Sequence, residues 1–259
     1  MKNKINVGII GYGNVGGSIC KYFKRYKRKI FVLTRKNIEN EKYIEFYNYE
    51  KIEEFLKKVN LILICIRDDK IFEIIETLKN FDLSGKIIYH TSGSLTSDIL
   101  KSLKNVYVGS LHPIQTFPKP NYKLLENIYF SFEGEKFRIA QKLVKFFKSK
   151  IIKIDKEKKM LYHIACIFAS NFSDLMWIIS DKLIKSSIRN KNFKILVPLV
   201  KTTLNNAIKY GPKEALTGPA KRKDYELIKK HLKALENNKE IFEIYKLLSE
   251  IILKGFSSF

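Results

Sequence analysis

The sequence has little cysteine, and its few cysteines are poorly placed for chemistry. Cys20, Cys65 and Cys166 are odd in number, far apart in the chain, and each embedded in an apolar segment. This pattern argues against a disulfide framework, and the absence of a C-x-x-C pair argues against a cysteine metal site. We expect buried thiols and no metal.

Long apolar runs are also lacking. The longest candidate membrane segment, residues 164–179, is interrupted by four polar residues between positions 170 and 174. It is therefore interpreted as too short and too polar to span a bilayer. The opening residues Met1-Lys2-Asn3-Lys4 lack the apolar region and cleavage site of a signal peptide. We expect a cytoplasmic protein with no membrane contact.

Acidic residues are scarce relative to basic ones, 26 against 49, which gives a formal net charge of +23. The lysines are spread along the chain and no recognisable nucleic-acid module accompanies them, so we expect no nucleic-acid partner. A positive field would still attract an anionic cofactor and a small anionic substrate. With 45% hydrophobic residues, the chain is long and apolar enough to bury an ordinary globular core.

What is present begins with a glycine-rich segment near the N-terminus. The apolar run over residues 5–10 is followed by Gly11-Tyr12-Gly13-Asn14-Val15-Gly16, and then by a helix-like mixture of apolar and basic residues. In this context Gly11 permits a tight turn, Gly13 lets the backbone approach a pyrophosphate, and Gly16 allows close packing of helix on strand. The segment predicts a dinucleotide site, with a purely structural turn as the alternative.

The end of the second predicted strand indicates which dinucleotide. NAD-binding proteins usually place an acid about 20 residues after the glycine motif, where it binds the ribose 2′-OH. Here the strand over residues 30–34 ends in Thr34-Arg35-Lys36, and the acid is missing. A hydroxyl and two cations suit a 2′-phosphate, so NADP(H) is favoured. The alternative is that Arg35 and Lys36 are only surface cations.

Strand-like segments alternate with helical ones through the first half of the chain. The strand-like segments are residues 5–10, 30–34, 43–49, 61–66, 86–90, 106–110, 128–132 and 151–154. Such alternation predicts a doubly wound, mainly parallel α/β sheet covered on both faces. Later helical patterns cover about residues 156–185, 193–210, 224–237 and 239–253. We expect a Rossmann domain over 1–154 and an all-α domain over 155–259, the latter for substrate binding and dimerisation.

Ligands of such sheets bind outside the carboxyl ends of the strands. Ile66 and Arg67 end one strand and are expected beside the cofactor. Another strand opens into His90-Thr91-Ser92-Gly93-Ser94, where hydroxyls, Ser92 in particular, would bind a substrate carboxylate or the nicotinamide. The alternative is structural, with Ser94 or Thr96 capping a helix over 98–103.

His112 follows the strand over 106–110, in the segment Leu111-His112-Pro113-Ile114-Gln115-Thr116-Phe117-Pro118. The prolines of this segment predict a loop. His112 either lines the substrate pocket or only bonds backbone in a rigid turn.

The first helix of the second half carries a stripe of polar residues. Lys159, His163 and Asn171 lie at helical spacing on one predicted face. His163 is the candidate proton donor, because its ordinary pKa of about 6.5 is near working pH, and Asn171 would orient the substrate or the nicotinamide amide. Lys159 is the alternative donor, and a packed structural histidine is the alternative reading of His163.

Several segments together resemble a known family. They are the glycine motif, His90-Thr91-Ser92-Gly93, Leu111-His112-Pro113, Tyr162-His163-Ile164-Ala165 with Ala169-Ser170-Asn171, and Ala215-Leu216-Thr217-Gly218-Pro219-Ala220-Lys221-Arg222-Lys223-Asp224. The whole chain resembles Rossmann-like NADP oxidoreductases of largely unassigned substrate. Its layout is similar to that of pyrroline-5-carboxylate reductases, ketopantoate reductases and 6-phosphogluconate-dehydrogenase-like enzymes. Lys223 departs from the pattern, which has glycine before Asp224.

The resemblance implies an NADPH-dependent reductase that acts as a homodimer. It suggests an alternative class of ketopantoate reductase, which would reduce 2-dehydropantoate for pantothenate biosynthesis. Separately, Gly218-Pro219 interrupts the helical pattern and predicts a bend, which would bring Thr217 and Arg222 to an active-site rim. Arg222 would bind the substrate carboxylate through two of its guanidinium nitrogens, and the alternative is that it only caps or pairs with Asp224. The rival hypotheses are a cyclic imine reductase acting on a pyrroline carboxylate and a dinucleotide-binding regulator without turnover.

Overall fold

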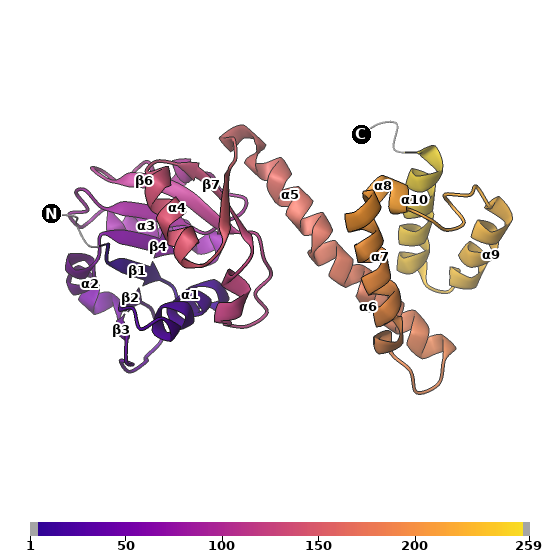
Figure 1. Ribbon diagram of the computed structural model, residues 1–259, viewed down its shortest axis with the longest axis horizontal. Helices are drawn as coiled ribbons and strands as arrows, with labels where there is room; N and C mark the ends of the chain where they lie inside the picture. The colour runs from indigo at the N-terminus through magenta and orange to yellow at the C-terminus, as the bar shows by residue number, and fades with distance from the viewer. Residues whose placement is uncertain (1–4, 256–259) are drawn as a thin grey trace. The chain divides into compact units, whose positions relative to one another are not determined.

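The computed structural model describes residues 5–255, and the chain divides into two compact units, Met1–Ser170 and Asn171–Phe259 (Figure 1). The expected division fell between residues 154 and 155, where the sheet ends. In the structure the helix α5 (Lys159–Ala169) still belongs to the first unit. The candidate residues Lys159 and His163 therefore share a unit with the sheet.

The first unit is built on one eight-stranded sheet with the order β3-β2-β1-β4-β5-β6-β7-β8. Its strands are β1 (Val7–Ile10), β2 (Ile30–Leu33), β3 (Ile44–Tyr47), β4 (Leu61–Ile64), β5 (Ile87–His90), β6 (Tyr107–Pro113), β7 (Tyr129–Gly134) and β8 (Lys150–Lys153). All neighbours pair in parallel except β6 and β7, which are antiparallel. The predicted doubly wound, mainly parallel sheet is confirmed.

Two separate apolar cores lie on the two faces of this sheet, because strands β1, β2 and β4 are apolar at every position. On one face α1 (Asn14–Arg25) and α4 (Phe137–Phe146) bury Tyr22, Phe23 and Val144 against the sheet. On the other face α2 (Ile52–Lys58) and α3 (Asp68–Leu78) pack through Phe55 and Ile75. Figure 1 shows these helices on opposite sides of the strands.

Short 3-10 helices complete the connections. They are η1 (Tyr49–Lys51), η2 (Ser97–Leu100), η3 (Tyr122–Leu125), η4 (Lys156–Lys158) and η5 (Phe193–Leu196). The expected helix over 98–103 is only the single turn η2. Thr96 occupies its N-cap position, but no side-chain hydrogen bond caps it. The Thr96 side chain therefore does not cap this helix, contrary to one of the expectations.

The predicted loop over residues 111–118 begins later than expected, after Pro113. Leu111, His112 and Pro113 continue β6, where they pair with Phe132, Ser131 and Phe130 of β7. Proline is tolerated because Pro113 is the last residue of the strand and its missing N–H interrupts no further ladder. The consequence is functional, because His112 is held on a rigid strand.

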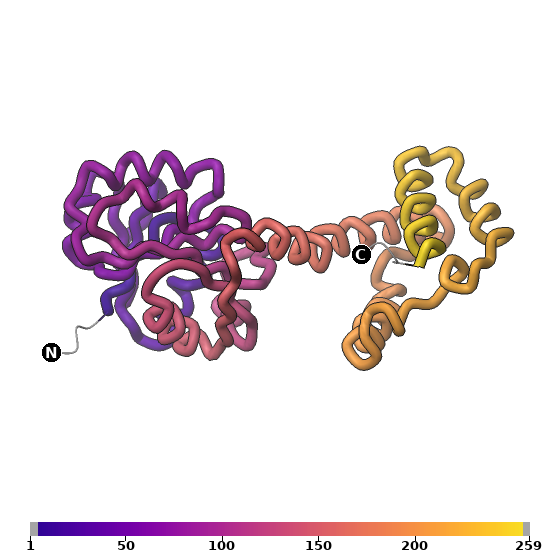
Figure 2. Tube along the Cα trace, turned by 90° about the horizontal axis from the view of Figure 1, so that it is seen from above, coloured from indigo at the N-terminus to yellow at the C-terminus, as the bar shows by residue number. Residues whose placement is uncertain are grey.

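The second unit is helical. Its helices are α6 (Asn171–Ser187), α7 (Val197–Tyr210), α8 (Pro212–Ala215), α9 (Tyr225–Leu235) and α10 (Lys239–Lys254), and Figure 2 follows the same chain as a tube. The predicted continuous helix over 156–185 is instead η4, α5 and α6, because Ser170 leaves helical geometry at φ −124° and ψ −76°. The stripe of Lys159, His163 and Asn171 is thus broken before Asn171.

The stretch Lys156–Ser187 is long and apolar enough to cross a membrane by length and composition, since an 18-residue window within it has a mean hydropathy of 1.2. The expectation that this region is too short to span a bilayer is therefore not supported by its length. The evidence for a membrane span is weak, because core helices of globular proteins pass the same test. No part of the apolar window is buried within the described chain.

Candidate functional site

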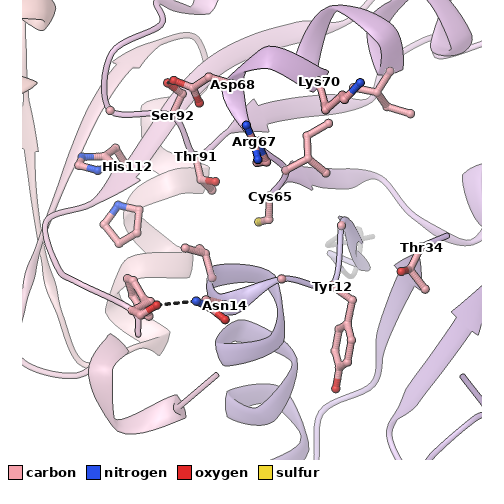
Figure 3. A pocket seen from close by; sticks show the side chains of 18 of the residues that line it. Tyr12, Asn14, Thr34, Cys65, Arg67, Asp68, Lys70, Thr91, Ser92 and His112 are labelled. Carbon is pink, nitrogen blue, oxygen red and sulfur yellow. Dashed lines mark hydrogen bonds between the residues drawn. The ribbon is translucent and has the colours of Figure 1, made fainter. Parts of the chain in front are cut away.

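A cavity of about 600 Å³ lies at the carboxyl ends of the parallel strands of the first unit (Figure 3). Its lining includes predicted site residues from six different segments, namely Gly11, Tyr12, Gly13, Asn14, Val15, Thr34, Arg35, Lys36, Ile66, Arg67, Ser92, His112 and His163. A doubly wound sheet produces this convergence because its strand ends share one edge. The cavity also contains residues that sequence patterns did not indicate.

The glycine-rich turn forms one wall of this cavity. Gly11 has φ +101° and an added Cβ would lie 2.6 Å from the carbonyl oxygen of Cys65, so only glycine fits there. Gly16 approaches the carbonyl of Gly11 so closely that a Cβ would lie 2.1 Å from it. At Gly13 nothing lies within 4 Å of an added Cβ, which leaves open space beside the N-terminus of α1. That space suits an anionic group on backbone N–H donors.

Thr34 and His112 lie at opposite sides of the cavity in Figure 3, and Arg35 and Lys36, which follow Thr34 in the chain, also line the cavity. The Thr34 hydroxyl accepts a hydrogen bond from the backbone N–H of Lys36 at 3.2 Å. Arg35 pairs with Glu73 and lies over the ring of Tyr49 at 5.5 Å. Because the Arg35–Glu73 pair is exposed, it holds the guanidinium only weakly.

Asp68 organises the loop that follows β5. Its Oδ2 accepts hydrogen bonds from the hydroxyls of Ser92 at 2.7 Å and Ser94 at 2.8 Å. Ser92 Oγ in turn accepts from the backbone N–H of Leu95 at 3.0 Å. Ser92 is buried and lines the cavity, so its predicted position is right, but its hydroxyl is already occupied by Asp68.

Two histidines and a tyrosine meet at the other end of the cavity. Nδ1 of His112 lies 2.7 Å from the hydroxyl of Tyr162, and the His112 and His163 rings are 6.0 Å apart between centroids. Gly93 passes between the two rings, since an added Cβ would lie 2.4 Å from Cδ2 of His163 and 2.9 Å from Nε2 of His112. Burial, with His163 and Lys159 nearby, lowers the pKa of His112 to about 4.

His90 lies beneath the same loop and is fully buried. Its Nε2 donates to the carbonyl of Thr96 at 3.1 Å, and its Nδ1 accepts from the N–H of Ser92 at 3.2 Å. Burial lowers the pKa of His90 to about 4, and the nearby Lys159 contributes. His90 is therefore a neutral imidazole that fixes the Ser92 backbone.

Lys159 does not line the cavity; its side chain is only 1% exposed and pairs with Glu133. Its Nζ also donates to Ser110 Oγ, which donates to the carbonyl of Ser92 at 3.3 Å. Burial lowers the pKa of Lys159, while Glu133 opposes that shift. Lys159 therefore stabilises the Ser92 loop indirectly, through its hydrogen bond to Ser110.

Asn171, Thr217 and Arg222 belong to the second unit and are not among the residues that line this cavity. Asp224 caps α9 by accepting from the N–H of Leu227 at 3.1 Å, and within residues 5–255 no ion pair joins it to Arg222. Lys223 has φ +59°, a conformation that glycine adopts without the steric cost that a side chain brings.

Three residues of this hydrogen-bond network, Asp68, Glu133 and Tyr162, were not singled out by the sequence analysis. Glu133 and Tyr162 have partners that lie 26 and 50 residues away in sequence. Only a three-dimensional structure pairs such distant side chains.

Comparisons with known proteins agree with this geometry. A Rossmann-like domain model matches residues 1–113, and a domain of unknown function, DUF2520, matches residues 128–252. No curated protein matches the chain in sequence.

Solved structures are similar over the whole chain. A candidate NADP oxidoreductase from Bacteroides fragilis is 23% identical with a TM-score of 0.79, covering 97% of this chain and 98% of that one. Pyrroline carboxylate reductase from Plasmodium falciparum, solved with NADP bound, is 15% identical with a TM-score of 0.61 and coverage of 98% and 99%. An imine reductase from Aspergillus terreus is 14% identical with a TM-score of 0.70 and coverage of 97% and 95%. These likenesses establish a Rossmann-like domain followed by a helical domain.

Proposed function

We propose that this protein is an NADPH-dependent reductase that acts on a small molecule with a C=O or C=N bond. The observation that carries the proposal is one continuous cavity that joins the glycine turn, the Thr34-Arg35-Lys36 cluster and the His112–His163 pair. The open space at Gly13 suits a pyrophosphate, and the two cations suit a 2′-phosphate. The folds of the Plasmodium and Aspergillus reductases, both solved with NADP or a reduced form of it, support the same cofactor.

NADPH, when bound, supplies the hydride. The chain's own residues then have three tasks. The glycine turn and the cations of the strand ends hold the dinucleotide, and the neutral His112 offers a hydrogen bond to the substrate heteroatom. His163 donates the proton, because it lines the same cavity as His112 and an imidazole can act as a general acid.

Two substrate classes fit this proposal. The first is a small 2-oxo acid, with 2-dehydropantoate as the candidate and pantoate as its product, from the sequence resemblance. The second is a cyclic imine such as a pyrroline carboxylate, and two similar structures named as pyrroline carboxylate and imine reductases favour it. Asp68, the first residue of α3, also holds its carboxylate beside the Ser92 loop. This negative charge attracts a cationic iminium and repels the carboxylate of a 2-oxo acid.

The test is a screen of NADPH oxidation with a panel of 2-oxo acids and cyclic imines. Turnover with 2-dehydropantoate alone would assign a ketopantoate reductase, and turnover with the imines would assign an imine reductase. Tight NADPH binding with no oxidation across the panel would instead indicate the dinucleotide-binding regulator and refute the reductase.

His163→Ala compared with Lys159→Ala tests the proton donor, once both variants are shown to be folded. We expect His163→Ala to lower kcat by roughly 100-fold, since general acid catalysis contributes about 10²–10⁴-fold. If His163→Ala keeps near-normal kcat while Lys159→Ala loses as much, lysine carries the proton.

Asn171 remains a candidate for orienting the substrate, and Arg222 for binding its carboxylate. An unchanged KM for the substrate in Arg222→Ala would count against the role of Arg222.

We also propose that the protein is a homodimer in which a second copy covers the apolar helices of the second unit. Phe172, Ile178, Leu199 and Ile208 are between 45% and 74% exposed. Helix α6 also carries the Asp181–Lys185 ion pair, which lipid would not solvate. Light scattering in detergent-free buffer should give a dimer, and Ile178→Glu should give monomers. Protein that is soluble only with detergent would indicate a membrane partner instead.

A further inference from the structure

Tyr162 and His112 come from different elements but meet inside the first unit. Tyr162 lies on α5, and His112 is the second-to-last residue of β6. The two rings are packed edge to face at 82°, with their centroids 5.9 Å apart. The 2.7 Å between the hydroxyl oxygen and Nδ1 is a strong hydrogen bond. Both side chains are partly buried, so this bond has little competition from water.

The chemistry of the two groups decides which one donates. The pKa of His112 is lowered to about 4, so its imidazole is neutral and carries one proton. Burial raises the pKa of Tyr162, so the phenol keeps its proton. A phenol O–H is a stronger acid than the N–H of a neutral imidazole, whose bare nitrogen is the better acceptor. The hydroxyl therefore donates to Nδ1, and the single imidazole proton is on Nε2.

Nε2 of His112 lies beside Gly93. It is 2.9 Å from the position of an added Cβ on Gly93, and Gly93 and His112 both line the cavity. Within residues 5–255 no hydrogen bond to Nε2 is formed, whereas Nδ1 is occupied. Nε2–H is thus available to a ligand.

We propose that Tyr162 is a positioning residue, which fixes the tautomer of His112 so that Nε2–H points at the heteroatom of the substrate. The role rests on the proposed reductase activity. During reduction a hydride forms the new C–H bond, the π pair of C=O or C=N moves to the heteroatom, and the heteroatom takes a proton from His163. His112 stabilises the developing negative charge and keeps its own proton, since a neutral imidazole is a weak acid.

The direct test is the tautomer of His112 in solution, read from long-range ¹H–¹⁵N correlations of the imidazole nitrogens and assigned with His112→Gln. The wild type should show a protonated Nε2 and a bare Nδ1. Tyr162→Phe keeps the ring packing and removes the donor, and should give a mixture of the two tautomers. A wild type protonated on Nδ1, or a Tyr162→Phe spectrum identical to the wild type, would overturn the proposal.

Kinetics supply the second readout. Tyr162→Phe should lower kcat by roughly tenfold, about the worth of one hydrogen bond, with KM for NADPH unchanged. In a His112→Gln background, where the amide donor has no tautomer, Tyr162→Phe should have no further effect. An equal effect in both backgrounds would show that Tyr162 acts otherwise. Tyr107→Phe, an exposed tyrosine of β6, is the matched control.

The two proposals fail separately. A protein with the expected tautomer shift but no NADPH oxidation on any carbonyl or imine would refute the reductase and leave the effect of Tyr162 on His112 intact. Turnover with an unshifted tautomer would refute only the role of Tyr162.

Discussion

Lys159 and Glu133 form a buried ion pair, with Nζ 3.2 Å from Oε1 and the two side chains exposed by 1% and 3%. Glu133 also accepts from the backbone N–H of Ser97 at 2.5 Å and from its hydroxyl at 2.7 Å. Removing one charge of such a pair leaves the other uncompensated in a medium of low dielectric.

The first prediction follows from this pair. Lys159→Met should lower the free energy of unfolding by about 3–5 kcal/mol, because Glu133 stays buried without its cation. Urea unfolding measures the change. Lys158→Met is the control, since that lysine is 77% exposed and its partner Asp155 lies 3.5 Å away. A Lys159→Met protein as stable as wild type would mean that the pair has no structural role.

The second prediction separates the cofactor site from the fold. Gly13→Ala should leave the thermal midpoint unchanged, because φ at Gly13 is −90° and nothing lies within 4 Å of the new methyl group. NADPH affinity, measured by calorimetry, should still fall, since the methyl group occupies the space proposed for the pyrophosphate. Gly16→Ala should behave oppositely and destabilise the protein, because its Cβ would lie 2.1 Å from a carbonyl oxygen. Unchanged NADPH affinity in Gly13→Ala would place the dinucleotide elsewhere.

The third prediction concerns cofactor choice. Arg35→Asp should weaken NADPH binding relative to NADH by on the order of 1.5–3 kcal/mol, the worth of one charge-assisted contact. Lys42→Asp changes the net charge equally but lies outside the cavity, and should alter both affinities alike. A retained NADPH/NADH preference in Arg35→Asp would make Arg35 a surface cation.

The fourth prediction is a loss of stability in acid. The pKa of His90 is about 4 in the folded protein, below its ordinary 6.5, so the unfolded chain binds more protons between these values. This contribution to stability is complete above pH 6.5 and is lost as the pH falls towards 4. Between pH 7.5 and 5 it amounts to on the order of 2 kcal/mol. His112, with the same shift, adds a similar amount.

Unfolding in urea at the two pH values checks this. In His90→Asn the difference between pH 7.5 and pH 5 should shrink by about the contribution of one histidine, even if the variant is less stable at both. An undiminished difference would assign the acid sensitivity to other groups.

The fifth prediction tests the one departure from the family pattern. Lys223→Gly should raise the free energy of unfolding by about 1 kcal/mol, because lysine adopts φ +59° there at a steric cost that glycine avoids. Lys221→Gly is the control, and a gain at position 221 instead would contradict the argument.

The sequence by itself determined the sheet and the end of the cavity that is lined by the glycine turn and by Thr34, Arg35 and Lys36. Apolar runs with glycine punctuation specify strands and turns locally, and the contribution of Gly11, Gly13 and Gly16 depends on backbone geometry within a single turn. For the same reason Thr34, Arg35 and Lys36 were found from one strand end. These signals need no knowledge of distant parts of the chain.

Tertiary structure alone decided the other end of the cavity, which is lined by His112 and His163. Whether Lys159 or His163 faces the cavity depends on which side of α5 packs against Glu133, a residue of another strand. The pairing of His112 with Tyr162 required β6 to extend through Pro113, which pairing with β7 stabilises although proline argues locally for a loop. Buried charges and hydrogen bonds join residues far apart in sequence, and no pattern of neighbouring residues encodes such partners.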